Sequence, residues 1–148
     1  MVASSRRSGY RFLPKVAIAD VAFAVRGADL HSLFESAARA LTEVMVDRRT
    51  LVSRVEKRVE LGPAAPDILL YDLLTQLIVM KDVDSLLFKS FRVSLTSGRR
   101  PKLRAVMKGE KIDRDRHALR NDVKAVTMHM FGIKGKAGSF EATVVLDI

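Results

Sequence analysis

The chain has 148 residues, of which 48% are hydrophobic, and a formal net charge of +9 at pH 7. This length suits one folded domain with one core, and the apolar content is too high for a mostly disordered chain. No apolar run approaches the ~20 residues needed to cross a bilayer. The sequence has no cysteine, which excludes disulfides and thiolate metal sites and is compatible with a reducing cytoplasm.

The basic charge favours encounters with nucleic acid, anionic membranes or acidic proteins, without choosing among them. There is no Trp, and the 7 Phe residues fall mostly on expected core positions. They are not interleaved with Arg and Lys, as a base-stacking surface for nucleic acid requires. Charge alone therefore does not establish a nucleic-acid function.

The N-terminal segment differs in composition from the rest of the chain. Residues 1–10 are polar and basic, and we predict that they form a disordered arm. The remaining residues, 11–148, are expected to form a single domain. Within it, residues 16–25 are rich in Val, Ala and Phe, which predicts a strand that ends at Gly27.

Two helices are expected in the first half of the domain. Asp29 is a candidate N-cap, and apolar residues recur behind it at three- and four-residue steps as far as Met45. A second helix is expected over residues 67–80, with Pro66 in its first turn. Between the helices, residues 55–61 alternate between apolar and charged side chains, which predicts a strand with one face in water.

The second half of the domain is expected to contain strands only. Their predicted ranges are residues 86–95, 102–108, 122–133 and 140–146. The order of strand, helix, strand, helix and then several strands predicts an α+β fold. In this fold two helices pack on a mixed, largely antiparallel sheet.

Familiar catalytic signatures are missing from the sequence. There is no Gly-rich phosphate-binding loop, and no serine lies in a nucleophile elbow. His31, His117 and His129 are widely spaced, and none has a partner at the spacing of a zinc site. We therefore expect that the protein is not an enzyme.

Charged residues interrupt apolar strands at three places. Asp20 lies within the first strand, Lys124 lies beside Val126, and the last strand runs into Asp147 and Ile148. Each has a simple structural explanation: a carboxylate on the wet face, a lysine at a sheet edge, and a frayed chain end. By strand alternation, however, Lys124 shares a face with Val126, so we expect it to be partly desolvated and paired with Asp20 or Asp147.

Several segments in order along the chain resemble the archease family. They are Phe12-Leu-Pro14, Ala19-Asp-Val-Ala-Phe23, the block from Gly27 to Met45, Asp67 to Leu74, Val106-Met-Lys-Gly-Glu-Lys-Ile-Asp113, Lys124-Ala-Val-Thr-Met-His129, and the closing Leu146-Asp-Ile148. The resemblance covers nearly the whole chain after Arg11. Two family features are absent: a histidine before the first Ala-Asp, and a Trp in the second helix, where this chain has Leu73 or Leu74.

The resemblance implies a fold built on a strand-helix-strand-strand unit with a related unit inserted. It also implies a calcium-type site formed by Asp20, Asp147 and Ile148. The implied function is that of a non-catalytic, cytoplasmic cofactor of an RtcB-type RNA ligase, which raises the ligase's guanylation and turnover in tRNA splicing or RNA repair. Asp20, Lys124 and Asp147 are the residues expected to act in ligase activation.

The chemistry of the candidate ligands agrees with calcium. If the strands that carry Asp20 and Asp147 are neighbours, up to three carboxylates converge, and they repel each other unless a cation is present. All the ligands are oxygens, and calcium accepts their irregular geometry more readily than magnesium does.

Two other functions are also compatible with the sequence. One is a basic RNA-binding module without a ligase-specific role, which would use Arg99, Arg100, Lys102 and Arg104. The other is a metal-dependent hydrolase built on the same carboxylates. As a ligase cofactor, the protein is also expected to be able to contact RNA weakly or indirectly, and to make no membrane contact.

Overall fold

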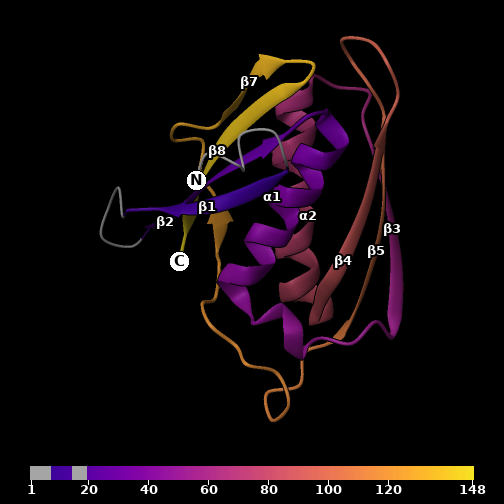
Figure 1. The fold of residues 1–148 in the computed structure, drawn as a ribbon. Coiled ribbons are helices and arrows are strands. Elements are labelled where there is room, and N and C mark those ends of the chain that lie inside the picture. The colour runs from indigo at the N-terminus through magenta and orange to yellow at the C-terminus, as the bar shows by residue number, and fades with distance from the viewer. Residues whose placement is uncertain (1–7, 15–19) are drawn as a thin grey trace.

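Two antiparallel sheets face each other across a layer of two helices (Figure 1). The computed structural model describes residues 8–14 and 20–148. The first sheet contains β1 (Gly9–Leu13), β2 (Asp20–Gly27), β8 (Ser139–Asp147) and β6 (Ala125–Val126) in that order, and β7 (Gly132–Lys136) also pairs with β8. The second sheet has the order β3 (Val55–Leu61), β5 (Leu103–Lys111) and β4 (Leu86–Leu95).

Helix α1 (Leu30–Met45) forms where its sequence pattern predicts it. The Asp29 side chain accepts a hydrogen bond from the Ser32 backbone N–H at 2.9 Å, which satisfies a donor that the first turn leaves free. The helix is buried on more than its apolar stripe, because Ala37, Ala38 and Ala40 are each 0% exposed. Small residues on several sides allow α1 to pack between both sheets.

Helix α2 (Pro66–Asp84) is longer than the expected range of residues 67–80. Pro66 occupies its first turn, where the missing N–H costs nothing. The helix ends at Ser85, which adopts a left-handed conformation with φ of 56°. The buried side of the helix extends one turn beyond the predicted leucine-rich stripe. The additional buried residue is Lys81, which is charged. A short 3₁₀ helix, η2 (Arg48–Thr50), connects α1 to β3.

The region from residue 122 to residue 133 is not the continuous strand that we expected. It contains β6, which has only two residues, and the first residues of β7. The chain between them turns, with Met130 at φ of 57°, and leaves Met128 68% exposed. An apolar run therefore misled the strand assignment, because part of this run faces solvent rather than the core.

The N-terminal boundary also differs from the prediction. Gly9 and Tyr10 pair with β2, and Tyr10 packs against the core, so the domain includes residues that we assigned to the arm. The other described residue of the arm, Ser8, is exposed, and residues 1–7 lie outside the described residues. Residues 15–19, which include part of the predicted strand 16–25, lie outside them as well.

The predicted α+β class is confirmed, with two helices packed on antiparallel sheets. The strands divide between two sheets rather than joining into one, and every pairing among the described strands is antiparallel. No helix in the described part of the chain is both long and apolar enough to cross a membrane.

Candidate functional site

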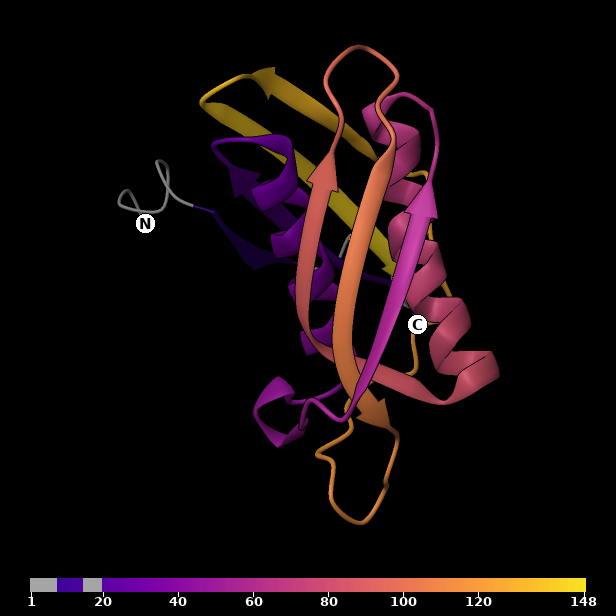
Figure 2. The ribbon, with the colours of Figure 1, turned by 90° about the vertical axis from the view of Figure 1, so that its right-hand side faces the viewer.

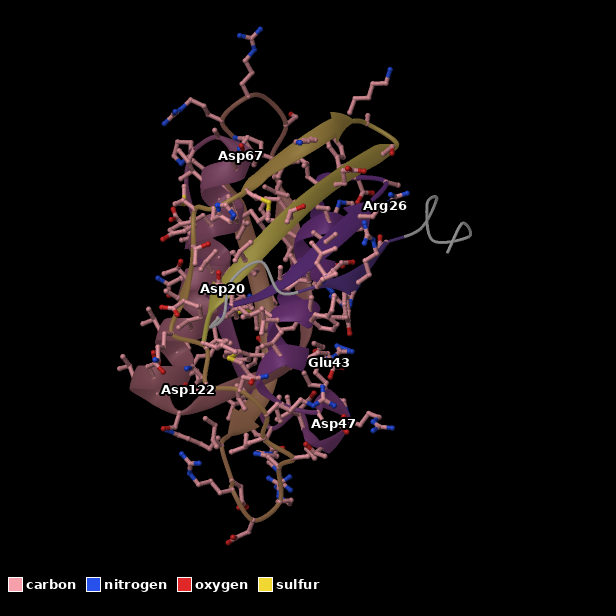
Figure 3. All side chains as sticks on the ribbon, turned by 90° about the vertical axis from the view of Figure 1, so that its left-hand side faces the viewer. Asp20, Arg26, Glu43, Asp47, Asp67 and Asp122 are labelled. Carbon is pink, nitrogen blue, oxygen red and sulfur yellow. The ribbon has the colours of Figure 1, made fainter. Side chains whose placement is uncertain are left out.

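Asp20 and Asp147 are direct partners at the end of the β2–β8 ladder. Opposed residues of an antiparallel pair place their side chains on the same face of the sheet. Their neighbours Val21 and Leu146 pack against the core, so the two aspartates lie on the opposite, outer face. Both are half-buried. Figure 3 shows Asp20 at this end of the first sheet.

Lys124 reaches the same strand end through its backbone. Its N–H donates to the carbonyl oxygen of Asp147 at 2.8 Å, while Ala125 is the partner of Asp147 in β6. Lys124 directly precedes β6, so two consecutive residues meet Asp147, an irregularity like that of a β-bulge. Asp20, Lys124 and Asp147 thus meet at one strand end.

The bulge corrects our expectation for the Lys124 side chain. Val123 and Val126 both belong to the buried core, whereas Lys124 and Ala125 between them are exposed. Lys124 therefore does not share a face with Val126, and the prediction that it is partly desolvated was wrong. The irregular pairing shifts the alternation, and the lysine side chain is exposed.

Lys81, which the sequence analysis did not single out, holds the segment that leads into Lys124. The Lys81 side chain is 8% exposed, and its Nζ donates to the carbonyl oxygen of Val123 at 2.7 Å. It also pairs with the carboxylates of Asp82 and Asp122. Burial alone would lower its pKa, but the hydrogen bonds that Lys81 donates to the carboxylates of Asp122 and Asp82 outweigh burial and raise the pKa of Lys81. The sequence did contain a signal for this role of Lys81, because the residue continues the apolar stripe of the helix at helical spacing.

The residues expected to hold a metal fit calcium only if backbone or terminal oxygens take part. Within residues 8–14 and 20–148, no three His, Asp or Glu side chains converge closely enough to hold an ion. Asp20 and Asp147 supply two carboxylates on one face, and Ile148 follows directly with its side chain against the core. Calcium accepts carbonyl as well as carboxylate oxygens, so this donor set suits it better than it suits zinc.

A second charged cluster lies in the Gly-Glu segment, around the buried carboxylate of Glu110. One carboxylate oxygen of Glu110 accepts hydrogen bonds from the Val52 N–H at 2.7 Å and from Arg116 at 3.1 Å, and lies 2.8 Å from His117 Nε2. The other oxygen contacts a second Arg116 nitrogen and lies 3.4 Å from Arg54 Nε. The Arg116 hydrogen bond is the largest influence that lowers the pKa of Glu110, to about 2.

This cluster links the connection that follows β5 to the residues that precede β3. His117 Nδ1 accepts a hydrogen bond from the Asp113 N–H at 2.9 Å, so its proton lies on Nε2, which donates to Glu110. The Asp113 carbonyl also accepts from the N–H groups of Arg116 and His117. Among the described residues, no buried side-chain nitrogen or oxygen of this cluster lacks a hydrogen-bond partner, which favours a structural role for Glu110.

Glu110→Gln is expected to destabilise the fold by about 2–4 kcal/mol at neutral pH, because it leaves buried donors without a charged acceptor. Since folding lowers the pKa of Glu110 from 4.5 to about 2, its contribution is complete above the higher value and is lost as the pH falls through the lower one. Urea unfolding at several pH values should therefore show the two proteins converging in acid. Glu141→Gln, at a side chain that is 55% exposed, is the control. A constant difference between the proteins at every pH would contradict the expectation.

The chain is a small α+β protein with two helices between two antiparallel sheets and a pair of aspartates at one strand end. Its similarity to known proteins shows the family to which it belongs. The model of the archease protein family matches residues 10–148. The chain is 37% identical over 131 residues to Protein archease of Methanothermobacter thermautotrophicus, covering 88% of this chain and 93% of that protein. It is 33% identical over 132 residues to Protein archease of Pyrococcus abyssi, with the same coverage. The chain belongs to the archease family.

Solved structures agree with this assignment. The solution structure of protein 1598 of Methanobacterium thermoautotrophicum superposes with a TM-score of 0.81 at 36% identity, covering 95% of this chain and 99% of that one. The crystal structure of an archease and possible chaperone from Thermotoga maritima gives a TM-score of 0.64 at 19% identity, with coverage of 92% and 96%. The second similarity supports the fold alone.

Proposed function

We propose that this protein binds an RtcB-type RNA ligase in the cytoplasm and raises its guanylation and turnover without catalysing a reaction itself. The observation that carries the proposal is the strand end where Asp20 opposes Asp147 and the Lys124 N–H binds the Asp147 carbonyl. These are the positions that the resemblance to archeases associates with ligase activation.

The chemistry of this strand end suits the task. The side chain of Lys124 is exposed and can contact a phosphate or a carboxylate of the ligase, while the two aspartates can hold a divalent cation. Fixed charges placed where charge develops are usually a large term in nucleotidyl transfer. Calcium, when bound, would supply positive charge that offsets the repulsion between the two carboxylates.

The hydrogen bonds that hold the strand end in place fit the same proposal. Lys81 fixes residues 122 and 123 from the helix layer, and the β2–β8 ladder fixes both aspartates. A charged group acts on a partner's site most effectively when its position is set before binding. The site therefore presents its two aspartates from the ends of paired strands, and Lys124 from the hydrogen-bonded segment that directly precedes β6.

Ligation by the cognate ligase under multiple-turnover conditions tests the proposal. We expect the protein to raise both ligation turnover and the rate at which the ligase becomes guanylated, and to show no ligation or nucleotide hydrolysis alone. Ligation unchanged by the protein would contradict the proposal. Nucleotide hydrolysis by the protein alone would instead support the metal-dependent hydrolase.

A further inference from the structure

The second sheet presents one complete face to solvent. Figure 2 shows β4, β5 and β3 side by side, with the helices behind them. The residues on this face form rows across β3, β5 and β4: Glu56–Lys108–Ser90, Arg58–Val106–Arg92 and Glu60–Arg104–Ser94. All are exposed except Val106, which is half-buried. We refer to these residues as the outer sheet face.

Positive charge exceeds negative charge on the outer sheet face. Each of its two glutamates is already paired with an arginine, Glu56 with Arg58 at 3.1 Å and Glu60 with Arg104 at 3.8 Å. Arg92, in contrast, forms no ion pair with any residue that the structure describes. Its positive charge is therefore available to a partner.

The positive charge continues beyond the strands. Lys108, like Arg92, forms no ion pair within the described ranges. The hairpin between β4 and β5 adds Arg99, Arg100 and Lys102, all exposed, without any acidic residue. A nine-residue strand such as β5 is roughly 30 Å long, so the basic side chains are spread over a distance that spans several phosphates of a nucleic acid.

The chemistry of the face selects the backbone of a nucleic acid over a protein. A stable protein interface needs an apolar centre, but Val106 is the one apolar residue among those named for the face. The face also lacks an aromatic side chain on which a base could stack. What remains are guanidinium and ammonium groups, which bind phosphate oxygens without reading sequence.

We propose that the outer sheet face binds the phosphate backbone of RNA, independently of sequence. The choice of RNA over DNA rests on the proposed function, because phosphate contacts alone do not distinguish them. Figures 1 and 2 place this face on the opposite side of the helix layer from the first sheet, whose β2–β8 ladder carries Asp20 and Asp147. RNA and ligase can therefore be bound at the same time.

Fluorescence anisotropy with a labelled single-stranded RNA of about 20 nucleotides, longer than the roughly 30 Å face, tests this inference. The full chain should bind two unrelated sequences with equal affinity, and binding should weaken as salt increases. The double variant Arg92→Glu/Lys108→Glu should lower the affinity about tenfold or more and reduce the salt slope by about 1 to 2. Thermal unfolding checks that the variant is folded.

Lys134→Glu/Lys136→Glu is the matched control, since it makes the same change in charge at exposed residues of β7 in the first sheet. It should change the affinity less than about threefold. An equal loss in both double variants would show that net charge alone attracts RNA, and would overturn the proposal. Binding of polyglutamate or of phosphatidylserine vesicles as tightly as RNA would overturn it as well.

Ligase guanylation measured without RNA separates this inference from the proposed function. The Arg92→Glu/Lys108→Glu variant should stimulate guanylation as the unmodified protein does. If it loses that stimulation but still binds RNA, the outer sheet face contacts the ligase, and the RNA proposal is wrong. If the unmodified protein binds RNA through this face but never stimulates a ligase, the proposed function fails while this inference stands.

Discussion

Replacing Gly109 with alanine is expected to prevent normal folding of the second sheet. Gly109 lies in β5, opposite Phe88 of β4, where the pairing of the two strands is irregular. A Cβ atom at this position would lie 2.0 Å from the carbonyl oxygen of Leu87 and 2.5 Å from the Cα of Phe88. Both are backbone atoms, so the clash is relieved only if β4 and β5 separate.

The cost should exceed about 4 kcal/mol, which is large against the stability of a small domain. Circular dichroism during heating or urea titration would measure it. Gly9→Ala is the matched control, because Gly9 also lies in a strand and a Cβ there meets no atom within 4 Å. A Gly109→Ala protein that melts like the unmodified protein would contradict the close approach of β4 and β5.

Asp147→Asn is expected to abolish both stabilisation by calcium and activation of the ligase. The amide keeps the size of the carboxylate but removes the charge that a cation requires. At a calcium concentration about 100 times its Kd, the unmodified protein should melt about 5 °C or more higher than without calcium. Asp20→Asn should behave in the same way, because the two residues are direct partners.

Lys124→Ala distinguishes the proposed binding of calcium from the proposed contact with the ligase. Its side chain is exposed, so the variant should fold normally and keep the calcium-dependent shift, while stimulation of the ligase falls about tenfold or more. Lys136→Ala, also exposed in the first sheet, is the control. If calcium does not change the melting temperature of a protein that still activates the ligase, the metal proposal is wrong, and the charged side chains must act without an ion.

The elements that the sequence predicts well are those defined by local pattern. Asp29 and the apolar stripe behind it specify α1, and the alternation in residues 55–61 specifies β3, because capping and periodicity depend on neighbours in the chain. The break between β6 and β7 was missed because nothing local indicates that Met128 faces solvent. Exposure there depends on the packing of distant segments.

The candidate site shows the same division. Asp20 and Asp147 drew attention as charges in apolar strands, but their register as partners depends on how β2 and β8 pair. Lys124 was identified as a candidate, but the prediction that its side chain is partly desolvated was wrong. The irregular pairing with Asp147 shifts the alternation, and the side chain is exposed. Burial of Lys81 depends on partners 41 and 42 residues away, which no local pattern reveals.

The helix layer between the sheets also affects how this protein can evolve. The Asp20–Asp147 strand end and the outer sheet face share no strand, and the buried side chains of α1 and α2 lie between them. A substitution on one outer surface therefore leaves the contacts of the other unchanged. Under the two proposals, evolution can change the charge of the outer sheet face, and with it the strength of phosphate binding, while the strand end keeps its contact with the ligase.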